Sequence, residues 1–581
     1  MTRDRGALDA ALGQLRLTGP LGLGAIIVLG FWAQRHLLTL YFGSDDLIHL
    51  QQAAGLIPTA PTPYRLVSQV VYFRSMWAAF GADPLPYYAF SLGMHVANAI
   101  LLHFGLLRLG GSRVLAWTAA AIFAACPAVT PMLGSAVNVN GGMALFLTLI
   151  AFLVAGPGLV RAALAGGAFL LALLSRETVV LLPFVPMLAG IGRQGASRAA
   201  AWRLLPTLGT LGVVGLVVLR SVGLGPGEVY GLGTPSTFVA NLATYGAWVS
   251  NLADPLPDII TAPHGELIVA GLLPHLAVFG APLALGASRR IVSLALAWWL
   301  LALLPVLILA QQTYLHYAYA ALPGAATGVA ATAVWLVSRW SSRGAPWRGT
   351  ASVSVLLTLV VSLSLRAEAM TRARLDAYTP DRALPLDPVR RKAELARRAV
   401  ASMRAALLPS DRDVAIYGAP SASTTYRVSD GAVVARKPTT GVDLLAAVLG
   451  GGLALRLFFP EVRRIEMVDH WTTQDCDRTL FLRGADVTIL RLGSGPGALA
   501  DGVALVIRNR LYADAVSLCD SALVCFPRDS TLRRLHVIAL TGAHRFDAAR
   551  ASLAGLPDSA ALSSWIGRVE AARSDAAGSA P

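Results

Sequence analysis

Long apolar runs recur along the first two thirds of the chain, and short polar breaks separate them. About 20 consecutive apolar residues are enough to cross a bilayer as an α-helix. The segment 236–254 is amphipathic and interrupted by asparagines, so we expect it to be interfacial or re-entrant. The remaining runs predict about eleven transmembrane helices, at 20–41, 86–109, 114–133, 141–157, 160–175, 177–191, 204–223, 265–287, 291–310, 317–338 and 350–366.

Beyond Arg366 the pattern becomes that of a water-soluble protein. Residues 367–400 predict a polar helix, and 412–495 contain the β-like runs DVAIYG, TLFLRG and DVTILRL, with the helix-like run VDLLAAVLGGGLALRLFF between the first two. This alternation predicts a small α/β region. We therefore divide the chain into a transmembrane domain at 1–366, a linker helix with an α/β domain at 367–498, and a helical tail at 499–581.

The helical tail contains a repeat. Tyr512 and Phe546 lie 34 residues apart, and a small residue follows each of them three positions later, Ala515 and Ala549. Thirty-four residues is the tetratricopeptide period, in which small residues let paired helices approach and the aromatic fills the gap between repeats. An ordinary helical hairpin is the alternative, because two copies are fewer than the roughly three that such arrays need.

Composition supports a membrane protein. Only 14% of the residues are charged and 55% are hydrophobic, whereas soluble domains carry about 25% charged residues. The net charge of +15 comes almost entirely from arginines scattered over loops and tail. That distribution favours anionic lipid headgroups as partners and argues against nucleic acid. The four cysteines fit no zinc spacing, and they permit but do not demand a disulfide within the tail.

The arginines also predict an orientation, because basic loops stay in the cytoplasm. Arg3, Arg5 and Arg16 place the N-terminus inside, ahead of a first span that we interpret as a retained anchor. The later basic loops also fall inside if 236–254 does not cross. An odd number of spans then exports the C-terminal region and makes 42–85 the longest external loop.

An acidic pair, Asp45 and Asp46, follows the first apolar run at the predicted outer surface of the membrane. A carboxylate at the centre of a span costs about 2.5–3.5 kcal/mol, and less at the interface. Neighbouring like charges raise each other's proton affinity, which suits a base that works near neutral pH. A solvated helix cap that begins at Ser44 explains the pair equally well.

Further motifs follow the acidic pair in a fixed order. They are Tyr64-Arg65-Leu66-Val67-Ser68, Gly81-Ala82-Asp83-Pro84, His95 with Asn98, LLSRETVVLLP at 173–183 and TYLHYAYAALPGAATG at 313–328. Over roughly residues 20–366 this order resembles the polytopic GT-C glycosyltransferases, in particular the protein O-mannosyltransferase-like branch with tetratricopeptide tails. Leu66 replaces the family's proline, and Gln311-Gln312-Thr313 stands where the family has a late arginine, so the resemblance does not imply which sugar is used.

The resemblance implies an all-α polytopic enzyme that moves a sugar from a polyprenyl-phosphate donor to an extracytoplasmic hydroxyl of a protein or glycan, with inversion. It would lie in the cytoplasmic membrane of a bacterium. By the same resemblance Asp45 is the first choice of base and Asp46 the second, or an orienting group. Arg65, then Arg176 and Arg74, would bind the donor phosphate through guanidinium forks. That branch uses no metal, so we expect neither a metal nor another cofactor.

Structural roles compete with each assignment. Arg65 could contact lipid phosphate only, and Arg176 could form an ion pair with Glu177. His95 fits an interhelical hydrogen bond, and the aromatic residues Tyr314 and His316 fit an interfacial belt.

Two other functions remain open. A transporter or flippase of lipid-linked saccharides predicts charges at mid-span and internal duplication. A membrane scaffold with a partner-binding tail would leave the acidic pair unconstrained.

Overall fold

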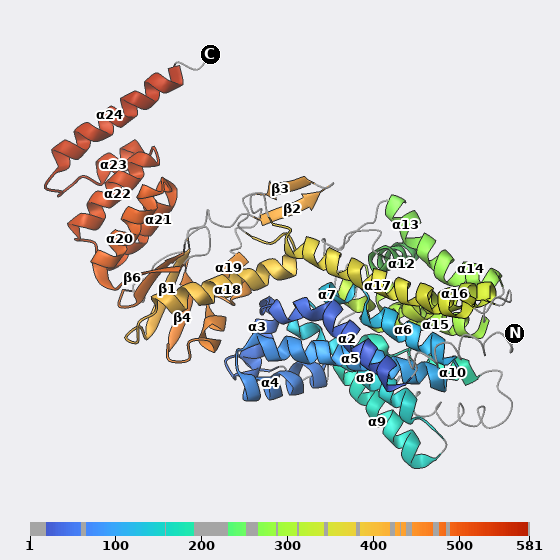
Figure 1. Cartoon of the computed structure of the whole chain (residues 1–581). Helices are drawn as coiled ribbons and strands as arrows, with labels where there is room; N and C mark the ends of the chain where they lie inside the picture. Colours follow the sequence, from blue (N-terminus) through green and yellow to red (C-terminus); the bar gives the residue numbers. More distant parts are fainter. Residues whose placement is uncertain are drawn as a thin grey trace. The chain divides into compact units, whose positions relative to one another are not determined.

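The structure is a computed structural model of the 581-residue chain (Figure 1). The predicted span 204–223 and Tyr64 lie outside the described residues. The described residues are 19–59, 65–156, 158–190, 231–250, 265–285, 289–310, 313–341, 347–378, 384–418, 425–429, 432–436, 444–468, 476–483 and 489–578.

The chain forms two compact units. The first, called the transmembrane unit, comprises Met1–Tyr378 with Pro385–Arg391, and the second, called the C-terminal unit, comprises Thr379–Leu384 with Lys392–Pro581. The predicted domain boundaries at 366 and 498 stay predictions.

The transmembrane unit is helical. Its helices are α2 Pro20–Gln34, α3 Ser44–Ala53, α4 Tyr72–Phe80, α5 Pro84–Arg108, α6 Arg113–Ala124, α7 Val129–Met132, α8 Val139–Val154, α9 Leu159–Ser175, α10 Phe184–Gly190, α12 Pro235–Val249, α13 Gly265–His275, α14 Ala281–Ala284, α15 Arg289–Leu307, α16 Leu322–Ser341 and α17 Trp347–Leu375. Short 3₁₀ helices at Arg35–Thr39, Ala136–Asn138, Glu177–Val179 and Leu315–Ala321 and π-helical turns at Leu66–Val71 and Leu276–Gly280 connect or extend them.

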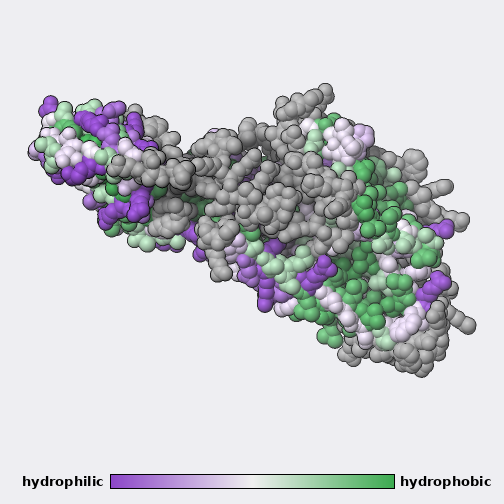
Figure 2. Space-filling view, turned by 90° about the horizontal axis from the view of Figure 1, so that it is seen from above, coloured by the Kyte–Doolittle hydropathy of each residue, from purple (hydrophilic) through white to green (hydrophobic). Residues whose placement is uncertain are grey.

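Six of the described helices are long and apolar enough to cross a membrane, and four shorter apolar helices coincide with further predicted spans. Ten of the eleven predicted spans therefore coincide with apolar helices, although the count of eleven stays a prediction. Large apolar side chains such as Val28, Phe31 and Leu365 are exposed on these helices. Apolar residues (green in Figure 2) gather over this unit, whereas hydrophilic ones (purple) predominate over the C-terminal helices. An apolar exterior of this extent indicates a multi-pass membrane protein.

Several helices finish at the same end of the transmembrane unit. The Gln34 amide, at the end of α2, donates to the carbonyl of Cys126 just after α6 at 3.0 Å. Arg35 forms an ion pair of 2.6 Å with Glu368 near the end of α17. We call this end of the bundle the α2 end. At the opposite end, the guanidinium of Arg108, the last residue of α5, donates to the carbonyl of Ala155 just after α8.

Because α2 and α17 finish at the same end of the bundle, the number of membrane crossings is constrained. If α2 and α17 both cross the membrane, their final turns emerge on one side, so an even number of crossings follows α2 up to the end of α17. The total is then odd, as the arginine distribution predicts. Which side of the membrane the α2 end faces stays a prediction.

Helix α12 covers most of the segment that we expected at the interface. Its interrupting residue, Asn241, is buried and donates to the carbonyls of Leu307 and Leu309 at 3.0 Å each. Thr313 donates to the Asn241 amide oxygen at 2.7 Å. The asparagine therefore satisfies backbone carbonyls where α15 ends, and the interfacial or re-entrant placement of 236–254 stays a prediction.

The C-terminal unit contains an α/β layer. Strands β1 Asp413–Gly418, β4 Arg464–Val468, β5 Thr479–Arg483 and β6 Ile489–Gly493 form one sheet in the order β4-β1-β5-β6. Strand β1 runs parallel to β4 and β5, β6 is antiparallel to β5, and β2 Thr425–Ser429 pairs separately with β3 Ala432–Arg436. The three β-like runs of the sequence are thus confirmed as strands β1, β5 and β6.

Two expectations for this region were wrong. The run 367–400 is not one helix, because α17 continues to Leu375 and α18 covers Pro388–Ala406. Pro388 occupies the first turn of α18, and the Asp387 carboxylate accepts the backbone N–H of Val389 at 3.0 Å, as a helix start requires. The expected single helix between β1 and β5 is also divided, into α19 Leu444–Val448 and a 3₁₀ turn at Leu453–Leu457, because glycines 450–452 adopt positive φ.

The helical tail comprises α20 Gly495–Arg508, α21 Tyr512–Cys525, α22 Ser530–Gly542, α23 Phe546–Ala551 and α24 Ser559–Gly578. Tyr512 and Phe546 each begin a helix, and a left-handed residue precedes each by two positions, Arg510 at φ 59° and His544 at φ 61°. The backbone conformation therefore recurs after 34 residues together with the sequence. The tetratricopeptide assignment stays a prediction.

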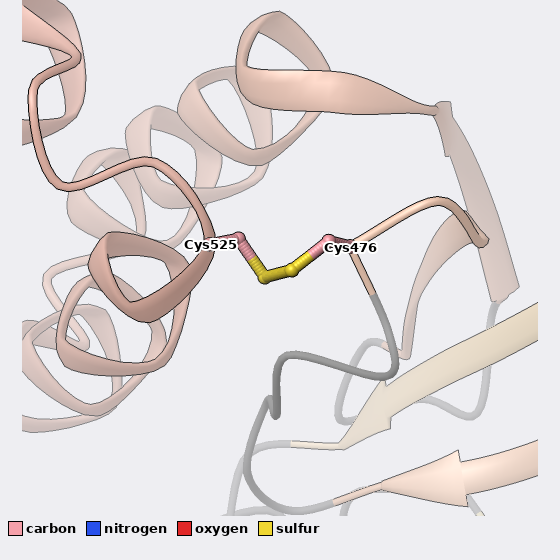
Figure 3. Close-up of a disulfide and its surroundings, with 2 residues drawn as sticks. All are labelled: Cys476 and Cys525. Atoms are coloured by element: carbon pink, nitrogen blue, oxygen red, sulfur yellow. A yellow bond between two sulfur atoms is a disulfide. The ribbon is translucent and has the colours of Figure 1, made fainter.

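The sheet and the tail share one hydrophobic core. Leu480 of β5 packs in the same cluster as Leu499 of α20 and Leu518 of α21. A disulfide joins Cys476, just before β5, to Cys525 at the end of α21 (Figure 3). Side-chain packing and the disulfide therefore both hold the helices of the tail against the sheet.

Candidate functional site

The two carboxylates of the acidic pair lie in different environments. Asp46 is fully buried, and its Oδ2 accepts the backbone N–H of Gly43 at 2.8 Å. Its Oδ1 accepts the Ser135 hydroxyl at 2.6 Å and the Val137 backbone N–H at 2.8 Å. Burial raises the pKa of Asp46 to about 6, against the lowering effect of these hydrogen bonds. Asp46 therefore fastens the start of α3 to the turn that leads into α8.

Asp45 is exposed in the first turn of the same helix. The Ser44 hydroxyl donates to its Oδ1 at 3.4 Å. Consecutive residues of an α-helix point about 100° apart, because there are 3.6 residues per turn. The helix therefore buries one carboxylate and presents the other, so Asp45 is the member of the pair that a substrate could reach.

His49 lies four residues after Asp45, on the same face of α3. Its Nδ1 is 2.9 Å from the Gln52 side-chain oxygen, and its ring packs against Phe73 with 5.2 Å between the centroids. Burial lowers the pKa of His49, the Asp45 carboxylate raises it and the Arg65 guanidinium lowers it. We did not single out His49 from the sequence, although its i+4 spacing from Asp45 was the available signal.

Arg65 forms a two-pronged ion pair with Glu177. Its Nη2 lies 2.7 Å from Oε1 and its Nε 3.2 Å from Oε2, and the two side chains are mostly buried. Arg65 adopts the left-handed conformation, with φ 51°, just before the π-helical turn. The neighbouring Ser68 hydroxyl donates to the Ser175 carbonyl at 2.7 Å. This pairing joins the loop after α3 to the end of α9.

Arg176 is buried, with 1% of its surface exposed. Its Nη1 donates to the Asn140 side-chain oxygen at 2.6 Å, and its guanidinium lies 4.8 Å from the centre of the Tyr317 ring. Gly141 makes room for this group, because a Cβ at that position would lie 3.1 Å from Nη1. A hydrogen bond and a cation–π contact thus hold the guanidinium in place.

Three aromatic rings from the segment before α16 complete this region. Tyr314 stacks on His316, with 5.3 Å between centroids and 14° between planes. His316 meets Tyr317 edge-on at 4.6 Å. The charges of Arg176 and Arg65 both act on the His316 ring. The aromatic segment therefore lies beside the Arg176 guanidinium; its roles in a site or in an interfacial belt stay predictions.

Two further candidates, His95 and Arg74, make their hydrogen bonds to other residues. His95 is buried between helices, with Nδ1 3.0 Å from the Tyr319 hydroxyl and Nε2 3.2 Å from the Ala124 carbonyl. These contacts are the interhelical hydrogen bonds expected as its structural role. Arg74 is exposed on α4 and donates to the Thr59 hydroxyl at 3.3 Å.

Six residues come together at the α2 end, and we call them the charged cluster. They are Asp45, His49, Arg65, Arg176, Glu177 and His316.

Among the described residues, no group of three or more His, Cys, Asp or Glu side chains is arranged to hold a metal ion. The expectation of a metal-free site stays a prediction.

No family model matches the chain, and no curated protein matches it. The fold is similar to the crystal structure of ArnT from Cupriavidus metallidurans bound to undecaprenyl phosphate, with 12% sequence identity and a TM-score of 0.41. The match covers 80% of this chain and 94% of that chain. A similarity at this level carries no argument about the activity of this chain.

Proposed function

We propose that the chain is an integral-membrane glycosyltransferase that uses a polyprenyl-phosphate-linked sugar. The observation that carries the proposal is the charged cluster. An exposed carboxylate, Asp45, acts on His49 together with Arg65, and Arg65 and Arg176 both act on Glu177, at one end of a bundle with an apolar exterior. A lipid-linked substrate can reach such a site from the membrane, and an acceptor can reach it from water.

Sugar transfer needs a negatively charged group that acts as a base and positively charged groups that bind the departing phosphate. The Asp45 carboxylate takes the proton of the acceptor hydroxyl while the acceptor oxygen attacks the anomeric carbon. The bond between that carbon and the phosphate oxygen breaks, and the electron pair leaves with the polyprenyl phosphate. Guanidinium forks stabilise the negative charge that develops there. One displacement inverts the configuration of the sugar.

Asp46 orients the site and does not act as the base. Its three hydrogen bonds already occupy both carboxylate oxygens. Arg65 remains the first candidate for phosphate binding and Arg176 the second. Arg74 is the weakest of the three, because its guanidinium is exposed and contacts the Thr59 hydroxyl rather than a member of the charged cluster.

The α2 end is assigned to the extracytoplasmic side. The N-terminal arginines favour a cytoplasmic N-terminus, and the exits of α2 and α17 share one end of the bundle. The disulfide of the C-terminal unit is typical of an oxidising compartment. Both observations agree with a bacterial cytoplasmic membrane in which the acceptor is an exported protein or glycan and the tetratricopeptide-like tail lies outside.

The experiment compares Asp45→Asn, Asp46→Asn and Arg74→Gln in membranes, with transfer measured from a radiolabelled polyprenyl-phosphate sugar. Asp45→Asn should lower transfer by about 10²–10⁴-fold at normal expression, the range typical of a lost general base. Asp46→Asn should retain measurable transfer per folded molecule, and Arg74→Gln should retain nearly all of it. Full transfer in Asp45→Asn would contradict the proposal and favour the transporter or the scaffold.

A further inference from the structure

The guanidinium fork of Arg65 is occupied by a side chain of the protein itself. Glu177 binds it through two parallel contacts, 2.7 Å from Oε1 to Nη2 and 3.2 Å from Oε2 to Nε. A phosphate monoester or diester binds an arginine through the same pair of N–H groups and the same geometry. The carboxylate and a lipid phosphate therefore compete for one fork.

The pair is shielded from water, with 13% of the Arg65 side chain and 15% of the Glu177 side chain exposed. Neither charge can therefore be left alone without a large cost, because partly buried charges need a partner. An anion that displaces the carboxylate restores the partner of Arg65 at once. Glu177 in turn needs a second cation.

Arg176 provides that cation. It directly precedes Glu177 in the chain, and its charge already acts on the Glu177 carboxylate. Asn140 and Tyr317 hold its guanidinium in place. A side-chain rotation of Glu177 away from Arg65 thus leaves the carboxylate beside a fixed positive charge.

We infer that Glu177 is a displaceable carboxylate that occupies the phosphate site of Arg65 and returns to it when the lipid phosphate leaves. This inference rests on the proposed function for the identity of the anion, a polyprenyl phosphate. Every binding event exchanges one carboxylate for one phosphate, so Glu177 weakens the site for the donor and for the product alike. The free phosphate of the product carries more charge than the phosphodiester of the donor, so the arginine alone would hold it more strongly. Competition from the Glu177 carboxylate speeds its release.

Glu177→Gln should therefore change binding and turnover in opposite senses. A neutral amide competes less well for Arg65, because hydrogen bonds between charged partners are roughly twice as strong as neutral ones. We expect undecaprenyl phosphate to bind about tenfold more tightly. KM and kcat should both fall, since substrate binds better and product leaves more slowly. A purely structural role for Glu177 would weaken binding instead.

The test measures binding of undecaprenyl phosphate to the purified full-length protein in detergent micelles. Inorganic phosphate is titrated separately, to distinguish recognition of the phosphate alone from recognition of the lipid-linked group. Arg65→Gln should weaken binding of the lipid phosphate, and Glu177→Gln should tighten it. Glu368→Gln is the matched control, because it also removes a buried carboxylate from an arginine, Arg35, but lies outside the charged cluster. It should leave affinity unchanged.

The possible outcomes distinguish failure of the displacement inference from failure of the proposed function. If the wild type binds undecaprenyl phosphate and Arg65→Gln weakens binding, but Glu177→Gln binds no more tightly, the displacement is wrong and the proposed function stands. If the wild type does not bind the lipid phosphate, both are wrong. Should Glu177→Gln not fold, Glu177→Asp replaces it. Its shorter side chain reaches the fork less well, so it should tighten binding about threefold, and unchanged or weaker binding would overturn the inference.

Discussion

The burial of Asp46 predicts an unusual dependence of stability on pH. Most carboxylates in folded proteins stabilise the fold when ionised, and acid removes that contribution. Asp46 has the opposite sign, because burial raises its pKa from 3.8 to about 6. The folded state therefore binds a proton more tightly than the unfolded state does. The stability that Asp46 contributes is present below about pH 4 and is lost as the pH rises through about 6.

The size of the effect follows from the pKa difference. Each pKa unit corresponds to about 1.4 kcal/mol, so a shift of about two units amounts to about 3 kcal/mol. Asparagine has nearly the shape of the protonated carboxyl and does not titrate. In Asp46→Asn the loss between about pH 4 and about pH 6 should disappear, whatever the stability of the variant at any one pH.

Alanine at the same position tests the hydrogen bonds rather than the charge. Asp46→Ala leaves three donors without an acceptor: the N–H groups of Gly43 and Val137 and the hydroxyl of Ser135. A buried donor without a partner costs about 1–3 kcal/mol, and the hydroxyl can rotate to another acceptor. The expected loss is therefore about 2–5 kcal/mol. Asp45→Ala, the exposed neighbour, should lose about 1 kcal/mol or less.

The assay is thermal unfolding of the purified proteins in detergent, at about pH 4.5 and about pH 7.5. Other carboxylates make stability depend on pH with the opposite sign: the pKa values of Glu394 and Asp411 lie below the usual range, so the stability that they contribute is lost as the pH falls. The quantity to compare is therefore the pH-dependent change in wild type minus that in Asp46→Asn. If the two proteins respond to pH in parallel, Asp46 does not titrate as its burial indicates, and the reasoning is refuted.

Three further changes test separate parts of the structure. Arg176→Leu removes a buried hydrogen bond and a cation–π contact and should cost about 2–4 kcal/mol, seen as low expression and a lowered unfolding temperature; the same temperature as Arg74→Gln would contradict this. Cys476→Ser opens a loop of 49 residues and should cost the C-terminal unit up to about 4 kcal/mol, measured by unfolding with and without reductant; a reductant-insensitive wild type would contradict it. His95→Phe should lower thermal stability but leave transfer per folded molecule within about twofold; a larger loss of transfer would place His95 in the catalytic site.

The sequence predicted the membrane helices well because each is a local property. A run of apolar side chains long enough for the bilayer is sufficient evidence, and contacts with other helices are not needed. The linker after α17 interrupts the helix expected over 367–400, because Pro388 favours the first turn of a new helix over the interior of a continuing one. The strands of the C-terminal unit were recognisable from short runs, but their order in the sheet depends on pairings between distant segments.

The partners within the charged cluster could not be predicted from the sequence. Arg65 and Glu177 are 112 residues apart, and Glu177 stands beside another arginine in the chain. Local spacing therefore suggested the pair with Arg176 instead. The different environments of Asp45 and Asp46 were open to prediction, because the rotation per residue of α3 that buries Leu47 and Leu50 buries Asp46 as well.

The two anchors of the loop after α2 explain why an acidic pair is useful there. Helix α3 has ten residues, too few to be stable alone in water. Asp46 ties its start to the turn before α8, and Arg65 ties the segment that follows it to Glu177 after α9. The distance between Asp45 and the arginine fork is thus set by bonds to two different helices. Weakening either anchor should disturb transfer even where Asp45 itself is unchanged, and the Asp46 bonds are the anchor that remains when a phosphate displaces Glu177.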